Sequence, residues 1–426
     1  MKSKACIVFI LLIFSASIFS QKDNTKYVDP TIGNVSRFLV PTYPTIQLPN
    51  QMIRMFPNKT DYISDVINGF PLQVTAHRRQ GILQFNVGTN RMSSESWKNS
   101  MPIDHDLEVV HPWFYSTYLI EDNIRVSFTP SKKSAIYKLE FPEGVQKNIL
   151  MRGTKNMHLE KSKNSFKILE KKSVKTRGEH AVENVMSIYV YAEIVDQNNL
   201  PITDLNINFE NASLHISADS TSSSAIYLKY AVSYISFDQA KVNFKREINK
   251  KTFDEVSNEG KKAWEKVINQ IQVEGGTTSQ KRTFYTALYR TYERMVDINE
   301  YGQYYSGYNK KIHKSDRPFY VDDWIWDTYL AHHPLRTILD PPAENDMLHS
   351  YTLMYKHSGW MPTFPQAHGN HLCMNAYHSS AIFIDGYRKG LKKYDVEMAY
   401  EGIKKNLLEG TYIPWRQGNP RGPLDD

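Results

Sequence analysis

The segment Phe319–Tyr329 holds side chains that could do chemistry on a sugar. It reads Phe-Tyr-Val-Asp-Asp-Trp-Ile-Trp-Asp-Thr-Tyr and places three carboxylates and two indoles within eleven residues, namely Asp322, Asp323, Asp327, Trp324 and Trp326. Aromatic faces stack on pyranose rings, while carboxylates bind hydroxyls or move protons in glycoside hydrolysis. The simpler interpretation is that the indoles anchor a core and the acids cap a helix.

Histidines and one cysteine are further candidates for chemistry. The adjacent pair His332 and His333, and the group His368, His371 and His378, could bind a metal, but no acid or Cys stands with them at the spacing of a zinc site. Zinc is therefore not favoured. Cys373 lies where a helical pattern opens, so we expect it to be a small packed residue and not a nucleophile.

The residues before this segment predict a β-rich domain over residues 24–245. Runs of β-forming residues are separated by polar turns, with few helices between them: Gly81–Gly88, Ile124–Pro130, Ala135–Phe141, Met186–Val195 and Ala225–Ile235. Many strands of this kind favour an antiparallel β-sandwich.

The hydrophobic period changes to that of a helix after residue 250. A linker helix is predicted over residues 250–275, where Gly275-Gly276 makes a break. The second domain, residues 276–426, is predicted to be helical: one helix face runs from Phe284 to Met295, and Pro341-Pro342 opens a helix that ends near Gly359. Two more helices are expected from Met374 to Gly390 and from Asp395 to Leu408. The chain is thus predicted to be a multidomain β + α protein, as its 426 residues also suggest.

The first 20 residues predict export. They combine a basic start, an apolar run and a small residue before polar Gln21, which is the pattern of a signal peptide cleaved near Ser20. No later run is apolar enough for a membrane span, so the mature chain is expected in the periplasm or outside the cell. The formal charge of +7 is scattered among acids, which argues against nucleic acid as a partner.

With these elements placed, the chain resembles glycoside hydrolase family 92, the calcium-dependent exo-acting α-mannosidases of Bacteroidetes. The resemblance rests on four segments in the expected order: Tyr27–Gly33, Phe284–Thr291, Trp326–Leu335, and Cys373–His378 followed by Asp385–Gly390. It implies a β-sandwich against an (α/α)6 barrel, an active site between the two, an α-mannose-containing glycan as substrate, inversion at the anomeric carbon, and calcium as cofactor.

The resemblance also implies roles for individual residues. The pair Trp326-Asp327 matches the family's pair at the subsite for terminal mannose, so Asp327 is expected to bind sugar hydroxyls and Trp326 to shape the pocket. Trp324, Asp322, Asn370 and His378 are further candidates for substrate binding, and Asp323 is a candidate catalytic residue.

The sequence departs from the family at the general acid. The segment His368–Met374 holds Asn370 or His371 where the family has a Glu. A histidine can donate a proton near neutral pH, so His371 is the predicted substitute, although glycosidic oxygen usually receives its proton from a carboxyl group.

A second departure concerns the extent of the barrel. About half of the twelve helices of an (α/α)6 barrel can be found, and the helices that carry the family's base are not among them. Three interpretations stay open. The chain is an incomplete mannosidase, either truncated or the first half of a split protein whose barrel a second polypeptide completes; it is a non-catalytic mannose-binding remnant; or phosphate replaces water in a phosphorolysis. For the last, or for an anionic sugar, His77, Arg78 and Arg79 are the candidate contacts.

Overall fold

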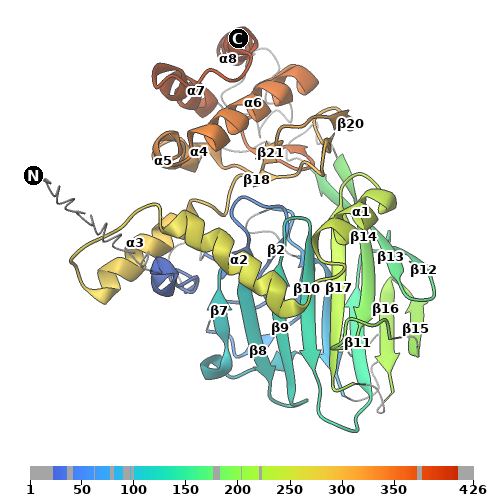
Figure 1. The fold of residues 1–426 in the computed structure, drawn as a ribbon. Helices are drawn as coiled ribbons and strands as arrows, with labels where there is room; N and C mark the ends of the chain where they lie inside the picture. Colours follow the sequence, from blue (N-terminus) through green and yellow to red (C-terminus); the bar gives the residue numbers. More distant parts are fainter. Residues whose placement is uncertain are drawn as a thin grey trace, which may run out of the picture.

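A computed structural model describes residues 23–35, 42–61, 63–76, 81–89, 96, 100–175, 183–202, 204–219, 223–371 and 377–410. A β-rich N-terminal domain is followed by a helical region, as the sequence predicts (Figure 1). Among the described residues, no helix is both long enough and apolar enough to cross a bilayer.

Two antiparallel sheets form the N-terminal domain. The eight-stranded sheet has the order β12 (His158–Lys161), β13 (Phe166–Lys175), β14 (Glu183–Val195), β17 (Ala225–Ser233), β10 (Ser134–Glu140), β9 (Ile124–Pro130), β8 (Phe114–Leu119) and β7 (Val109–His111). The five-stranded sheet has the order β15 (Leu205–Glu210), β16 (Ser213–Ala218), β11 (Lys147–Arg152), β5 (Ile82–Gly88) and β4 (Phe70–Gln73). Two short ribbons, β1–β2 (Ile46–Gln47, Arg54–Met55) and β3–β6 (Val66–Ile67, Met101–Pro102), and the 3-10 turn η3 (His105–Leu107) complete the domain.

The two sheets face each other across one hydrophobic core, which confirms the predicted sandwich. On β10, Tyr137 packs edge-on against Phe85 of β5 with ring centroids 4.8 Å apart, and its hydroxyl donates to the carbonyl of Pro71 at 2.6 Å. Tyr230 of β17 donates in the same way to Leu72 at 2.6 Å. Each buried tyrosine therefore fills the core with its ring and satisfies its hydroxyl on the opposite sheet.

Two helices cover the outer face of the eight-stranded sheet. α1 (Phe237–Glu247) and α2 (Phe253–Ile268) bury Phe244 and Val256 against Ile136, Tyr191 and Ala231. α2 begins at a capping box made by Thr252 and Glu255 and lies within the range predicted for the linker helix. Because these helices cover it, most residues of β9 and β10 are buried, although the face of β9 that points away from the sandwich core carries the polar residues Arg125, Ser127 and Thr129.

The start of the described chain docks on α2 and the following helix, α3 (Thr278–Arg290). Asn24, in the 3-10 turn η1 (Asn24–Tyr27), donates its backbone N–H to Asn269 Oδ1 at 3.1 Å, and Asp29 N donates to Thr286 Oγ1 at 2.9 Å. Arg290 Nη2 donates to the carbonyl of Pro30 at 2.8 Å. α3 ends at Arg290, so the predicted helix is too long: Met295, assigned to its face, lies beyond it, in the approach to a strand.

The second region contains α4 (Ile325–Thr328), α5 (His332–Leu339), α6 (Pro341–Ser358), α7 (His378–Arg388) and α8 (Val396–Glu409). As predicted, α6 starts at Pro341 and ends at Gly359, whose φ of 77° is the left-handed conformation that closes a helix. α8 starts after the cap Asp395. The predicted start of the preceding helix at Met374 lies outside the described residues.

Three two-stranded ribbons also belong to this region, although it is predicted to be helical. They are β18–β21 (Val296–Asp297, Tyr320–Val321), β19–β20 (Gln303–Ser306, Lys311–Lys314) and β22–β23 (Pro365–Gln366, Gly369–Asn370). In Figure 1, β18 and β21 lie between the sandwich and helices α4 to α8. The ribbons thus form the layer through which the two regions meet.

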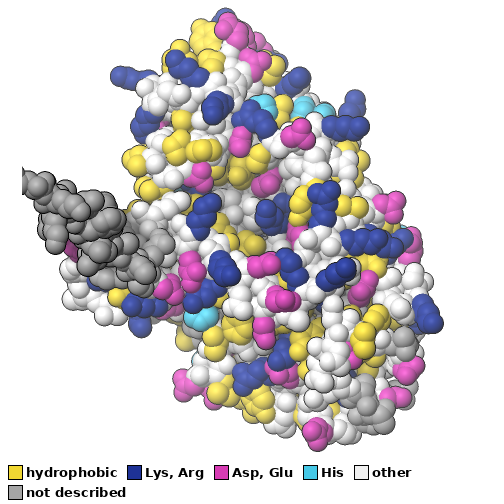
Figure 2. All heavy atoms as spheres, in the orientation of Figure 1, with side chains coloured by type: hydrophobic (Ala, Val, Ile, Leu, Met, Phe, Trp, Pro, Cys, Tyr) yellow, Lys and Arg dark blue, Asp and Glu magenta, His cyan; other side chains and the backbone are white. Residues whose placement is uncertain are grey.

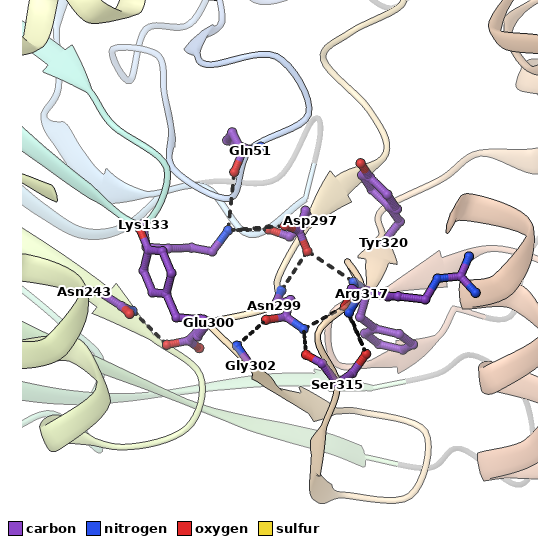
Figure 3. A network of polar contacts seen from close by, with 12 residues as sticks. Gln51, Lys133, Asn243, Asp297, Asn299, Glu300, Gly302, Ser315, Arg317 and Tyr320 are labelled. Atoms are coloured by element: carbon purple, nitrogen blue, oxygen red, sulfur yellow. Dashed lines mark hydrogen bonds and ion pairs between the residues drawn. The ribbon is translucent and has the colours of Figure 1, made fainter. Parts of the chain in front are cut away.

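Buried polar contacts join this layer to the sandwich (Figure 3). Lys133 Nζ donates to the backbone carbonyl of Asp297 at 2.9 Å. The buried Glu300 carboxylate accepts from Tyr234 N and from Asn243 Nδ2, both at 2.8 Å. Burial raises the pKa of Glu300 to about 7, although hydrogen bonds from Ser233, Tyr234 and Asn243 oppose this shift.

Candidate active site

Asp322 ties the candidate sugar-binding loop to the sandwich. It follows β21 with a φ of 63°, a left-handed conformation that Asp tolerates better than most residues. Its Oδ2 lies 2.7 Å from Arg54 Nη1 and its Oδ1 accepts from Gln366 Nε2 at 3.2 Å. Both charged side chains are fully buried, at 1% and 0% exposure. Asp322 therefore fixes the loop and is not open to a substrate.

Asp323 lies at the centre of a second buried network. Its Oδ2 lies 3.2 Å from His333 Nε2 and accepts from Thr328 Oγ1 at 3.0 Å and from the hydroxyl of Tyr351. Its Oδ1 accepts from Trp324 N at 2.8 Å. On the far side of the imidazole, His333 Nδ1 lies 2.9 Å from Glu344 Oε1. The histidine thus sits between two carboxylates.

The charges in this network favour an imidazolium between two carboxylates. Burial opposes the charge on His333, but the carboxylates of Glu344 and Asp323 outweigh it and raise its pKa to about 10. Burial also opposes ionisation of Asp323, but the hydrogen bond and charge of His333 lower its pKa to about 2. A carboxylate that is fully buried, always ionised and bound by four donors does not fit the predicted catalytic role. The geometry instead makes Asp323 a structural residue that binds the backbone of Trp324 and the side chain of Thr328.

The two indoles point into different surroundings. Trp324 is partly buried, with its ring 5.3 Å from that of Phe364 and the guanidinium carbon of Arg294 4.4 Å from its centroid. Trp326 is 42% exposed and meets His378 edge-on at 5.0 Å. His378 in turn lies 4.3 Å from the ring of Tyr329.

Asp327 shares this exposed surface with Trp326. Among the described residues, none makes a hydrogen bond or ion pair with its carboxylate, so its oxygens face solvent. The structure therefore places Trp326 and Asp327 at the surface, with half-buried His378 against the Trp326 ring, and an exposed indole beside a carboxylate suits stacking on a sugar and binding its hydroxyls.

Asn370 and His371 lie on the other side of Trp324. Asn370 Oδ1 accepts from the backbone N–H groups of Thr363 and Phe364 at 2.9 and 3.0 Å, so its amide shapes the hairpin and is not free for substrate. His371 N donates to the carbonyl of Phe364 at 2.9 Å, and the two rings are 5.7 Å apart. His371 is therefore near Trp324 but separated from it by Phe364.

A close backbone contact positions the hairpin β22–β23. A Cβ added at Gly307 would lie 2.3 Å from the carbonyl carbon of His368 and 2.5 Å from Gly369 N. Only glycine fits there, and the contact places the residues that follow, Asn370 and His371.

The side chains that could ligate a metal ion here are those of His, Cys, Asp and Glu. Within the described ranges, no group of three His, Cys, Asp or Glu side chains could hold a metal ion. The carboxylates of Asp322 and Asp323 are bound by Arg54 and His333. His77, Arg78, Arg79 and Cys373 lie outside the described residues.

Sequence reasoning missed three residues of this region: Arg294, Glu344 and Tyr351. No local motif singles out any of the three, and each interacts with the loop from another part of the chain, Glu344 through His333. The one available signal was the His332-His333 pair, which we examined only as metal ligands.

Comparisons with known proteins agree with this architecture. The model of the glycosyl hydrolase family 92 N-terminal domain matches residues 27–246, and that of the family 92 catalytic domain matches residues 239–422. No protein of curated description matches the chain.

Solved structures of the same family share the fold. A family GH92 inverting mannosidase from Bacteroides thetaiotaomicron superposes with a TM-score of 0.79 at 23% identity, over 92% of this chain and 56% of its own. A family GH92 α-mannosidase from the same species, in complex with mannoimidazole, gives 0.75 at 22% identity, over 90% and 55%. The chain thus spans just over half the length of these relatives. On the evidence of the two domain models, which together extend over nearly its whole length, the chain belongs to glycosyl hydrolase family 92.

Proposed function

We propose that this protein takes part in the hydrolysis of terminal α-mannosidic linkages of glycans, with inversion, after export from the cell. The observation that carries the proposal is the group formed by exposed Trp326 and Asp327, on the loop that the buried networks of Asp322 and Asp323 hold in place, and by half-buried His378. Family membership and the mannosidase names of the structural neighbours support it.

In this proposal the group holds the terminal sugar. The indole of Trp326 offers an apolar face to the pyranose ring, and the Asp327 carboxylate accepts from its hydroxyls. His371 is the proposed proton donor to the leaving oxygen. An inverting reaction also needs a base on the opposite side of the ring, which activates water.

We propose that further helical polypeptide supplies that base. Apolar side chains are exposed around α5, α7 and α8, including Ile338 at 73%, Leu330 at 70% and Leu408 at 68%. Large exposed apolar areas usually mark an interface. The relatives extend well beyond the span that this chain covers, and a polypeptide equivalent to that extension would cover these helices. Native mass spectrometry of the protein purified from its host tests for such a partner.

The alternative is a mannose-binding protein without activity. The burial and pairing of Asp323 favour it, because they remove one of the two predicted catalytic residues from the reaction. Binding of mannose without turnover is its distinguishing property.

Other polymers are poorer candidates as partners. Figure 2 shows Lys and Arg mixed with Asp and Glu over the face in view, without a basic stripe that would follow a nucleic acid backbone.

Export and calcium are separate proposals. For export, the mature protein should start near Gln21, which N-terminal sequencing of secreted protein tests. For calcium, we propose a requirement in the active enzyme with ligands outside the described residues; chelation by EDTA, followed by re-addition of calcium, tests it through activity.

The decisive experiment compares Asp327→Asn with the matched control Asp316→Asn, since Asp316 is also an exposed carboxylate. Calorimetry with methyl α-D-mannopyranoside and release of mannose from α-linked mannobioses are the readouts. We expect Asp327→Asn to abolish binding or turnover at unchanged melting temperature, and Asp316→Asn to behave as the parent. Equal affinity of Asp327→Asn and the parent would contradict the assignment, and binding without mannose release would select the alternative.

A further inference from the structure

Arg294 is a half-buried cation whose donors are open. Its guanidinium carbon lies 4.4 Å from the centre of the Trp324 ring. No described residue accepts a hydrogen bond or forms an ion pair with this guanidinium. Arg54 is different, because it donates to Gln47, Asp322 and Glu293.

The neighbouring carboxylates are not available to Arg294. Burial lowers the pKa of Arg294, while the charges of Asp322, Glu293 and Asp323 act against that shift. All three carboxylates therefore interact electrostatically with the guanidinium. Yet Asp322 is bound by Arg54 and Gln366, and Asp323 by His333, Tyr351 and Thr328. Glu293 is paired with Arg290 at 2.9 Å. The acids hold Arg294 in place by their field and leave its N–H groups unused.

Such an arrangement leaves the guanidinium free to bind a ligand. A guanidinium presents five donors in a planar fork, and no nitrogen of Arg294 is among the fully buried polar atoms of the described residues that lack a partner, so its fork is still reached by solvent. An arginine that stacks on an indole and keeps its fork open is suited to a planar pair of oxygen acceptors.

The local charge balance indicates whether the oxygen acceptors of the ligand of Arg294 are charged or neutral. Arg54 is matched by Asp322, and the single negative charge left by Asp323 and Glu344 around His333 is matched by Arg294. An anion would therefore meet no excess of positive charge. Neutral oxygens fit better, and adjacent hydroxyls of a hexopyranose provide two of them at the spacing of the fork.

We propose that Arg294 is a glycan-binding residue, which donates to a vicinal pair of sugar hydroxyls beside the indole of Trp324. This inference rests on the proposed function and adds a residue that neither the family resemblance nor the sequence pattern assigns. Trp324 and Arg294 then form one wall of the sugar site, on the inner side of the loop that exposes Trp326.

The test measures binding of methyl α-D-mannopyranoside and of its 2-, 3- and 4-deoxy derivatives by calorimetry. The variants are Arg294→Gln and Arg294→Lys, with Arg282→Gln, an exposed arginine of α3, as matched control and Asp327→Asn as reporter of the proposed site. Thermal unfolding of each variant accompanies the titrations.

We expect Arg294→Gln to weaken binding about ten- to a hundred-fold, the usual effect of losing hydrogen bonds from a charged donor. Arg294→Lys should recover part of the loss, because it keeps the charge and one donor. The parent should also bind two of the deoxy sugars more weakly, a discrimination that Arg294→Gln should no longer show.

Three outcomes would overturn the inference. If Asp327→Asn loses binding while Arg294→Gln keeps it, the proposed function stands and the role of Arg294 does not. If Arg294→Gln and Arg294→Lys lose binding only in step with a lower melting temperature, the residue is structural. If the parent itself binds no mannoside, the proposed function fails and the inference with it.

Discussion

Removing one partner of the buried pair Arg54 and Asp322 should destabilise the protein strongly. Arg54 Nη1 and Asp322 Oδ2 are 2.7 Å apart, and both side chains are buried. Asp322→Asn leaves a guanidinium buried without its counter-charge, a change that costs about 3–5 kcal/mol. Asn tolerates the left-handed backbone at this position and still offers an oxygen to Arg54, so we expect the lower end of that range and no added backbone strain.

Arg54→Met should cost more, because the same side chain holds two further acceptors. Arg54 donates to Gln47 Oε1 at 2.9 Å and to the carbonyl of Glu293 at 3.0 Å. Each buried acceptor left without a donor adds about 1–3 kcal/mol. The double variant should cost less than the sum of the two single variants, since it leaves neither charge unpaired.

Urea unfolding followed by tryptophan fluorescence and circular dichroism measures these changes. Because the pair joins the sandwich to the helical region, we also expect the variants to split one transition into two. Lys167→Gln is the control, since its ion pair with Glu160 is exposed at 31% and 62% and exposed pairs contribute little. If Asp322→Asn loses no more stability than Lys167→Gln, the pair does not hold the two regions together and our reasoning is refuted.

Three further predictions concern stability. His333→Gln should cost about 3–5 kcal/mol near neutral pH. Because the pKa of His333 is raised from 6.5 to about 10, the stability that its charge contributes is full below pH 6.5 and is lost as the pH rises through 10. The melting temperatures of parent and variant should therefore converge between these two pH values. Glu300→Gln should lack the loss of about 3 kcal/mol that the parent shows between pH 4.5 and 7, because the raised pKa of Glu300 makes ionisation unfavourable in the folded state; parallel melting curves at pH 5 and 8 would contradict this. Gly307→Ala should cost about 1–3 kcal/mol by overpacking against His368, whereas Gly144→Asn, in open space with a left-handed backbone, should cost little in the same denaturant titration.

The sequence predicts the long elements because their signals are local. β14 and β17 are continuous runs of β-formers, and α6 is bounded by Pro341 and Gly359, so period and end signals suffice. The ribbons β18–β21, β19–β20 and β22–β23 escape prediction because strands of two to four residues have no measurable period. Their pairing depends on tertiary contacts such as that at Gly307.

The candidate site was predicted as a cluster but not as a set of roles. The acids and indoles of Phe319–Tyr329 are adjacent in sequence, and that adjacency was visible. Which acid is buried depends on partners from elsewhere: Arg54 lies 268 positions before Asp322. No local pattern distinguishes Asp323, bound on all sides, from Asp327, which is open. The proposed substitution of the general acid, by Asn370 or His371, stays a prediction from the sequence; the structure places both residues beside Phe364.

The docking of the first described residues on α2 and α3 sets an order of events during synthesis. Asn24 and Asp29 meet their partners Asn269 and Thr286 only after some 245 to 257 later residues have left the ribosome. Until then the leading segment cannot take its place on α2 and α3, and a polypeptide that stopped at residue 245 would lack both of these partners. The fold thus delays the docking of its first described residues until the helices after the sandwich have been made.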